Sequence, residues 1–172
     1  MTGIKVLTTD EAKQVSKPWG WEKWIAHGTP DYPYAYKQIY IRAPYKTSLQ
    51  FHVFKQESNY LLKGSAILHY ADAPVDMERL GLDKHRYERG EYSSEELHTM
   101  LAPQLPDILS AIKTRTVNEG ETIHVWPGYV HRIEARDTDL LLMEVSTDHL
   151  MDVIRLHDDA SRPHGHIASE HK

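Results

Sequence analysis

The 172-residue sequence predicts an all-β fold, a small antiparallel sandwich or barrel, and two observations carry that prediction. Short runs with apolar and polar residues in alternation fill two regions of the chain, and such alternation is typical of half-buried strands. Gly, Pro and Asp residues separate the runs, as tight turns require. Many short strands with regularly spaced turn signals are characteristic of sandwiches and barrels.

Each run predicts one strand, and the runs fall at about 20–70 and 114–157. In the first region the runs are 35–42, 48–54, 60–62 and 65–70. In the second region they are 114–118, 122–126, 130–135, 140–146 and 153–156. The turn signals include Gly64, Gly120 and Gly128. We therefore expect one domain over residues 1–172, with a flexible tail from about residue 160.

Residues 71–113 have a different pattern and predict a mostly helical insertion. Ser93, Glu95 and Glu96 are typical of a helix start, because serine caps helix N-termini and acidic residues favour the first turn. Pro103 and Pro106 interrupt the segment, so a short or broken helix is expected. The insertion could cover the barrel, cap a pocket or form a partner surface. Its apolar stripe consists of Leu97, Leu101, Leu105, Ile108 and Ile112.

Composition narrows the class of function. The net charge is −5 and no basic block is present, so the electrostatic footprint of a nucleic-acid binder is missing. The chain has no cysteine, which excludes disulfides, thiolate metal sites and cysteine nucleophiles. No segment approaches the ~20 apolar residues of a membrane span, and no signal peptide is evident. We therefore expect a cytoplasmic protein with neither nucleic-acid nor membrane partners.

The most informative stretch runs from Ser48 to Glu57. Residues two apart on a strand share a face, so Gln50 and His52 point to one side, and the bulky residues between them point to the other. Glu57 follows after a turn and can rejoin the polar face from the next strand. This pattern is what the wall of a barrel needs beside an interior site.

A second stretch, residues 120–134, brings another histidine to the opening of a strand, at His131. One amide oxygen, two imidazoles and one carboxylate suit a borderline divalent ion such as zinc, manganese, iron, cobalt or nickel. Three or four protein ligands leave positions open for water or substrate. His124 and His69 are expected to be ordinary strand histidines. The tail adds His164, His166 and His171, for which adventitious metal binding is possible.

These spacings resemble the two motifs of the cupins, and more narrowly those of cupins related to type II mannose-6-phosphate isomerases. The resemblance covers roughly residues 17–70 and 116–162. It implies a double-stranded β-helix (jelly-roll) barrel. It also implies one divalent metal, zinc or manganese foremost, with Gln50, His52, Glu57 and His131 as ligands. The matching pieces are residues 17–20, Gln50, His52, Glu57, residues 64–66, 131–134, 144–145 and 153–155.

Three further residues are candidates for catalysis and substrate binding. Lys37 shares a face with two isoleucines, so it either reaches solvent or enters the cavity. In the cavity it could pair with a substrate phosphate or carboxylate, or serve in its neutral form as a base. Arg132 either forms a surface ion pair or, as the resemblance implies, contacts substrate. Glu144 belongs to a matching piece and is a further candidate substrate contact.

The resulting hypothesis is a metal-dependent isomerase or epimerase of a sugar or sugar phosphate. The metal would polarise a carbonyl or hydroxyl, and Lys37 or a metal-bound water would move the proton. Two alternatives are a non-catalytic metal-binding or sugar-binding cupin and an iron-dependent dioxygenase. Several inward Lys or Arg residues would favour a phosphorylated substrate, and an apolar lining would favour oxygen chemistry. The aromatic-rich segment 19–40 predicts a homodimer interface.

Overall fold

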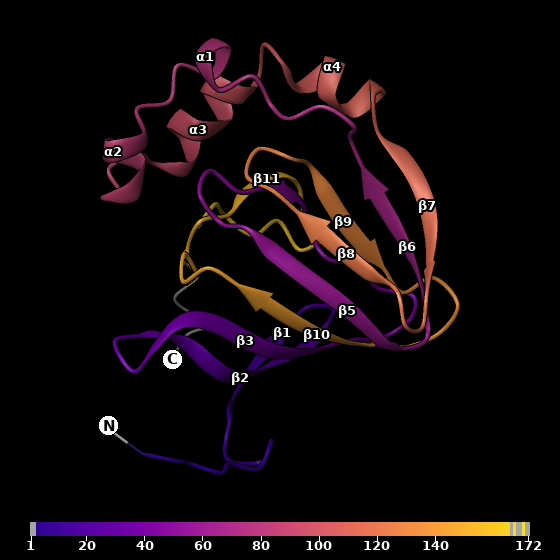
Figure 1. Cartoon of the computed structure of the whole chain (residues 1–172). Helices are drawn as coiled ribbons and strands as arrows, with labels where there is room; N and C mark the ends of the chain where they lie inside the picture. The colour runs from indigo at the N-terminus through magenta and orange to yellow at the C-terminus, as the bar shows by residue number, and fades with distance from the viewer. Residues whose placement is uncertain (1–2, 166, 168–169, 171–172) are drawn as a thin grey trace.

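The computed structural model describes residues 3–165, 167 and 170. In this part of the chain two antiparallel sheets face each other (Figure 1). The larger sheet has the order β1-β2-β3-β10-β5-β8, and the smaller has the order β11-β4-β9-β6-β7. Strands distant in sequence are therefore neighbours, such as β3 and β10, and each sheet combines strands from both halves of the chain. The all-β fold is confirmed.

The strand bounds are as follows. The larger sheet contains β1 (Lys13–Lys17), β2 (Gly20–Thr29), β3 (Tyr32–Ile41), β5 (Glu57–Lys63), β8 (Thr122–Val125) and β10 (Leu140–Ser146). The smaller sheet contains β4 (Leu49–Phe51), β6 (Ser65–Tyr70), β7 (Lys113–Asn118), β9 (His131–Glu134) and β11 (Ile154–His157). The sequence did not predict β1, which extends the larger sheet by pairing with β2.

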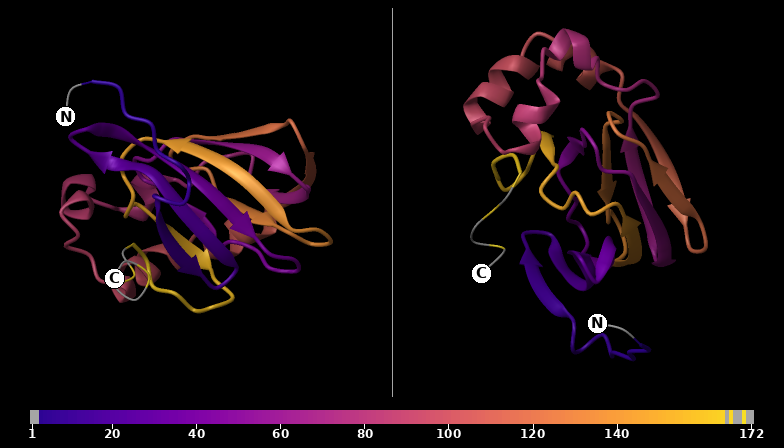
Figure 2. Two further views of the ribbon diagram at one scale, coloured as in Figure 1. Left: turned by 90° about the horizontal axis from the view of Figure 1, so that it is seen from below. Right: turned by 60° about the vertical axis from the view of Figure 1, so that its left-hand side comes forward.

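The insertion forms four short helices, α1 (Met77–Leu80), α2 (Lys84–Glu88), α3 (Ser94–Leu101) and α4 (Leu105–Ser110). Ser93 caps α3 in a capping box with Glu96, as the sequence indicated. The segment around Pro103 separates α3 from α4, so the expected broken helix is confirmed. Figures 1 and 2 show these helices gathered over one end of the barrel.

The apolar faces explain why the helices lie there. Leu97 and Leu101 of α3 are buried in a cluster with Phe51 and Ile154 of the smaller sheet and with Val130, which precedes β9. A second cluster, which includes Ile41, Leu61 and Leu142, fills the space between the two sheets. The insertion therefore covers the barrel, which is one of the three roles that the sequence left open.

The C-terminal segment, expected to be flexible, makes defined contacts wherever the structure describes it. Ile167 is buried, and the Arg162 guanidinium pairs with Asp158 and with Glu170. His164 accepts a hydrogen bond from the main-chain N–H of Arg155. These contacts attach the described part of the tail to β11 and to the residue that follows it. His166 and His171 lie outside the described residues.

Candidate metal centre

The cavity between the sheets is lined by residues whose strand parity turns them inward. Gln50 of β4 pairs across the sheet with His131 of β9 and with Arg155 of β11. Directly opposed residues of antiparallel strands point to the same face, so these three side chains form one row. His52 follows one residue after β4 and faces the same cavity. The neighbouring Phe51 packs toward the helices instead, as alternation requires.

His52, Glu57 and His131 form a compact, buried group. The Nε2 atom of His131 lies 3.1 Å from Oε1 of Glu57, and Nε2 of His52 lies 3.4 Å from Oε2 of the same carboxylate. One candidate ligand atom from each residue lies within 4.8 Å of the others. The structure thus brings together three of the four predicted metal ligands.

Both imidazoles are oriented by their other nitrogen. Nδ1 of His52 donates to the main-chain oxygen of Asp152, and Nδ1 of His131 donates to that of Tyr129 at 3.1 Å. Each Nε2 atom is thereby directed at the carboxylate of Glu57. Metal-binding histidines are typically held in this way through the nitrogen that does not bind the metal.

The group fits a divalent metal. Nε2 of His52 is buried and has no hydrogen-bond partner in the described structure. Buried polar atoms rarely stay unpaired, so such an atom facing a carboxylate and a second imidazole indicates a ligand position. Gln50, the fourth predicted ligand, lines the same cavity, and its Oε1 accepts a hydrogen bond from Ser48 Oγ at 2.5 Å.

The electrostatics keep the ligands in their metal-binding forms. Burial lowers the pKa of His52, which favours the neutral imidazole. Burial alone would raise the pKa of Glu57, but the Lys55 ammonium beside it holds that pKa well below its usual range. Lys55 Nζ lies 2.5 Å from Glu57 Oε2, and Asn59 donates to Glu57 Oε1 at 3.1 Å.

A chain of alternating charges leads away from this group. Lys55 also contacts Oε1 of Glu144 at 3.0 Å, and Lys37 Nζ lies 3.7 Å from the same oxygen. Lys37 then lies 3.5 Å from Glu22. Glu22 is fully buried, which by itself would raise its pKa, but Lys37, Lys17 and the Trp24 indole lower the pKa to about 2.

Only two of the three predicted substrate-contacting residues lie in the cavity. Lys37 and Glu144 are both buried and line the cavity. Arg132 lies on the other face of β9, since it follows the inward His131 by one residue. Its guanidinium donates to the main-chain oxygen of Thr47 at 2.8 Å and lies 3.7 Å from Asp159. Arg132 is therefore not a cavity residue, and strand parity alone could have shown this.

Sequence reasoning missed several cavity residues. Glu22 could have been found by parity, since it pairs with the inward Ile39 across β2 and β3. Lys55 could not, because it lies in the connection between β4 and β5, where no alternation applies. The others missed are Lys17, Asn59, Arg155, Arg162 and Glu170. The cavity has a volume of about 100 Å³.

Asp152, in the loop before β11, holds the segment that carries both His52 and Lys55. Its carboxylate accepts from the main-chain N–H groups of Val53, Phe54 and Lys55, at 2.9, 2.6 and 2.8 Å. Burial and the Asp152 carboxylate also raise the pKa of the Tyr87 phenol on α2. Asp152 therefore connects the helical insertion to the candidate metal centre.

Comparison with known proteins supports the fold directly. No family model and no curated protein matches the chain. Oxalate decarboxylase from Lactobacillus farciminis, solved as a formate complex, has 14% identity and a TM-score of 0.54, covering 86% of this chain. The capsular polysaccharide assembling protein CapF from Staphylococcus aureus has 14% identity and a TM-score of 0.55, covering 88%.

A third solved structure is matched over its full length. An uncharacterised Klebsiella pneumoniae protein with a double-stranded β-helix domain has 10% identity and a TM-score of 0.55, covering 91% of this chain and 100% of its own. The chain spans only 34% and 35% of the matched decarboxylase and CapF chains.

None of the helices in the described part of the chain is long and apolar enough to cross a membrane. At 10–14% identity the likeness to solved structures concerns the fold. It shows the double-stranded β-helix fold. Membership of the cupin superfamily and the narrower resemblance to mannose-6-phosphate isomerase-like cupins stay hypotheses. The chain has the double-stranded β-helix fold of the cupins.

Proposed function

We propose that the chain is a metal-dependent enzyme that moves a proton between adjacent carbons of an anionic sugar, as an isomerase or epimerase does. One observation carries the proposal: the buried group of His52, Glu57 and His131 opens onto a cavity that also contains an acid–base pair, Lys37 and Glu144. Metal ligands beside a separate proton-transfer pair are the parts that this chemistry needs.

Gln50, His52, Glu57 and His131 would hold the ion, with zinc or manganese foremost among the candidates. A bound ion would supply Lewis acidity to a carbonyl or hydroxyl oxygen. Glu57 is committed as a ligand, so the proton must move on another group. Glu144 is the carboxylate that the geometry offers as base. Lys37, an ammonium between Glu22 and Glu144, can give a proton to a developing alkoxide.

The charge of the lining favours an anionic substrate over an apolar one. Five cationic side chains and four carboxylates line the cavity, and a divalent ion would add further positive charge. An iron-dependent dioxygenase acting on a hydrophobic compound would need an apolar lining. The likeness to a capsular polysaccharide assembling protein is compatible with a carbohydrate substrate. The cations are Lys17, Lys37, Lys55, Arg155 and Arg162, and the carboxylates are Glu22, Glu57, Glu144 and Glu170.

Proton transfer at carbon can be tested without knowing the product. The zinc- or manganese-loaded protein is incubated in D₂O with a panel of sugar phosphates and their neutral parent sugars. Proton NMR then follows the loss of the C–H signal beside the carbonyl. We expect deuterium to enter at least one sugar phosphate. Exchange should be lost in His52→Ala and Lys37→Met and kept in Lys113→Met, a matched change at an exposed lysine.

The alternatives give different results in the same experiment. Metal binding without exchange in any sugar would favour a non-catalytic binding cupin and would contradict the enzyme. Substrate-dependent oxygen consumption by the iron-loaded protein, without exchange, would favour a dioxygenase.

We also propose a homodimer, as the aromatic segment 19–40 predicts. Trp21 and Tyr40 stack with ring centroids 5.3 Å apart on the outer face of the larger sheet. Tyr60, Leu62 and Val145 on the same sheet are 41%, 46% and 49% exposed, which is unusual for large apolar residues gathered on one face. A second copy would cover this face. Analytical ultracentrifugation should show a dimer that Val145→Lys dissociates, and a monomeric wild type would contradict it.

A further inference from the structure

Arg155 enters the metal cavity from the strand at the edge of the smaller sheet. It pairs with Gln50 across β11 and β4, and Gln50 pairs in turn with His131. The three residues thus share the inner face, with Arg155 two strands from His131. Neighbouring strands lie ~4.8 Å apart, so the two backbones are separated by ~10 Å. The Arg155 side chain is buried, with only 8% of the residue exposed.

The Arg155 guanidinium has no anionic partner among the described residues. Nη1 donates to the main-chain oxygens of Pro163 and Gly165, and Nε is buried without a hydrogen-bond partner. Every other cationic side chain of the cavity lining forms ion pairs with carboxylates. Lys37 and Lys55 each contact two carboxylates, and so does Arg162. A buried charge is costly unless it is paired.

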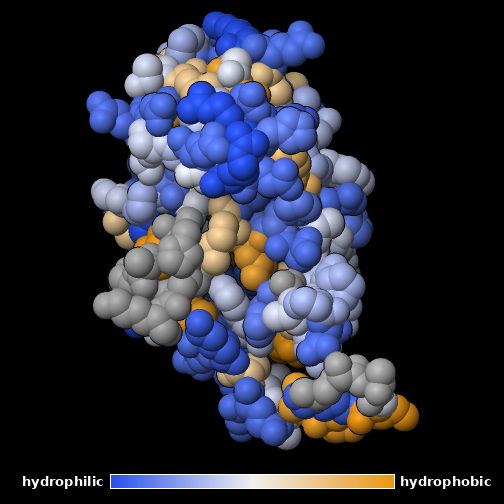
Figure 3. All heavy atoms as spheres, turned by 90° about the vertical axis from the view of Figure 1, so that its left-hand side faces the viewer, coloured by the Kyte–Doolittle hydropathy of each residue, from blue (hydrophilic) through white to orange (hydrophobic). Residues whose placement is uncertain are grey.

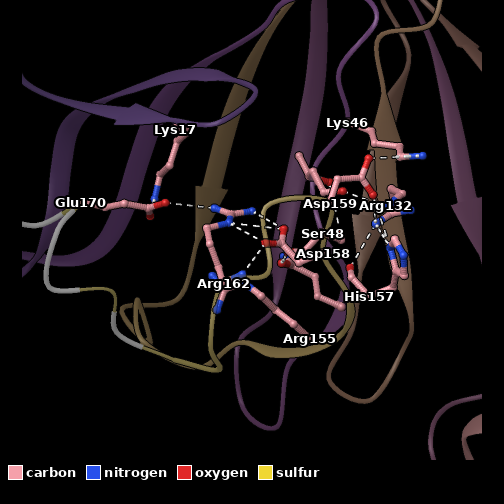
Figure 4. A network of polar contacts seen from close by, with 12 residues as sticks. Lys17, Lys46, Ser48, Arg132, Arg155, His157, Asp158, Asp159, Arg162 and Glu170 are labelled. Carbon is pink, nitrogen blue, oxygen red and sulfur yellow. Dashed lines mark hydrogen bonds and ion pairs between the residues drawn. The ribbon is translucent and has the colours of Figure 1, made fainter. Parts of the chain in front are cut away.

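The other charged side chains near Arg155 are paired with one another. Figure 4 shows Arg155 beside Arg162, whose dashed contacts run to Asp158 and Glu170, and Glu170 also contacts Lys17 at 2.7 Å. Burial and the nearby Arg162 lower the pKa of Arg155 to about 10, so it stays charged at neutral pH. In the face shown in Figure 3, hydrophilic residues cover the upper part, and hydrophobic atoms lie in a recess below them.

We propose that Arg155 is the binding site for the anionic group of the substrate, a phosphate or carboxylate carried at the end of the sugar remote from its carbonyl. The anion supplies the missing partner, because a guanidinium recognises such groups through parallel N–H bonds. The separation of ~10 Å lets a single extended sugar bind at Arg155 and at the metal group together. This inference rests on the proposed function for the identity of the ligand.

The test measures anion binding separately from turnover. Orthophosphate is titrated by calorimetry into metal-loaded wild type, Arg155→Gln and Arg155→Lys, and into His52→Ala, which should lack the metal. Gln removes the charge and keeps an NH₂ group that can donate to main-chain oxygens. Arg132→Gln is the matched control, since Arg132 is equally buried and also donates to main-chain oxygens but lies outside the cavity. Circular dichroism confirms that each variant is folded.

We expect Arg155→Gln to weaken phosphate binding about 10- to 100-fold, the effect of losing charge-assisted hydrogen bonds. Arg155→Lys should retain part of the affinity, Arg132→Gln should bind as wild type does, and His52→Ala should still bind phosphate. Unchanged binding in Arg155→Gln would overturn the assignment. Binding that persists in Arg155→Gln but disappears in His52→Ala would also overturn it, because the anion would then bind the metal. If Arg155→Gln does not fold, Arg155→Lys provides the test. Wild-type phosphate affinity in Arg155→Lys would then overturn the assignment.

Two further ligands separate the possible anions and the two proposals. Glucose 6-phosphate and glucuronate are titrated in parallel into wild type and Arg155→Gln. The ligand that binds wild type more tightly and loses affinity in Arg155→Gln identifies the phosphate or the carboxylate as the natural group. Arg155-dependent binding without deuterium exchange in any sugar would keep this site and reject the enzyme. Deuterium exchange with phosphate affinity independent of Arg155 would keep the enzyme and reject this site.

Discussion

Replacing Asp152 with asparagine tests how the candidate metal centre is held in place. The residue is buried, and its two carboxylate oxygens accept three main-chain N–H groups, two on Oδ2 and one on Oδ1. If the asparagine oxygen accepts from Phe54 and Lys55, as Oδ2 of Asp152 does, its NH₂ group faces the N–H of Val53. The variant therefore leaves one buried donor unsatisfied, at a cost of about 1–3 kcal/mol, and weakens two charge-assisted bonds by about 0.5–1.5 kcal/mol each.

We therefore expect Asp152→Asn to lower the free energy of unfolding by about 2–6 kcal/mol. The assay is urea unfolding of the metal-free protein in EDTA, followed by tryptophan fluorescence and checked for an unchanged m-value. Asp148→Asn is the control, because Asp148 lies in the same loop and is exposed. A loss below about 0.5 kcal/mol in Asp152→Asn, the range of ordinary surface changes, would refute the reasoning.

The same variant should also bind metal more weakly. The main-chain oxygen of Asp152 orients His52 through Nδ1, so a displaced loop misdirects the ligand atom Nε2. Changes to groups that orient a ligand typically cost 10- to 100-fold in metal affinity. Competition with a fluorescent zinc chelator measures this. Wild-type affinity in a destabilised Asp152→Asn would show that the loop does not orient His52.

Two further predictions concern stability. Glu22 has its pKa lowered from 4.5 to about 2, so its contribution is present above pH 4.5 and is lost as pH falls toward 2. The stability difference between wild type and Glu22→Gln should thus be about 3 kcal/mol at pH 7 and shrink below pH 4.5, while exposed Glu95→Gln shows little difference at any pH. Gly64 has φ +98°, and an added Cβ would lie 2.5 Å from the Asp139 oxygen. Gly64→Ala should lose at least about 2 kcal/mol, more than Gly90→Ala, whose Cβ meets nothing within 4 Å; equal losses would contradict the steric argument.

Period-two alternation explains what the sequence could predict. It directs Gln50 inward and Phe51 outward. It also places Lys37 on the face of two isoleucines, but whether that side chain reaches solvent or the cavity needed the structure. The same rule applied to His131 would have excluded Arg132 from the cavity. The helical insertion was predictable because Ser93 and the leucine stripe are local signals that tertiary packing then uses.

Other features depend on contacts between distant residues and carry no local signal. Lys55 faces the cavity because Asp152, almost a hundred residues later, fixes the preceding loop. The tail lacks apolar periodicity, yet His164 and Arg162 dock its described part through polar contacts. Arg155 was part of a motif match, but its missing anionic partner is visible only once all its neighbours are placed.

The most direct test of the central claim is the metal content of tag-free protein, measured by mass spectrometry after reconstitution and dialysis. We predict close to one zinc or manganese ion per chain in wild type, almost none in His52→Ala and His131→Ala, and wild-type content in His124→Ala, which removes an exposed strand histidine. A wild type without metal, or equal content in His52→Ala and His124→Ala, would contradict a metal centre in the barrel.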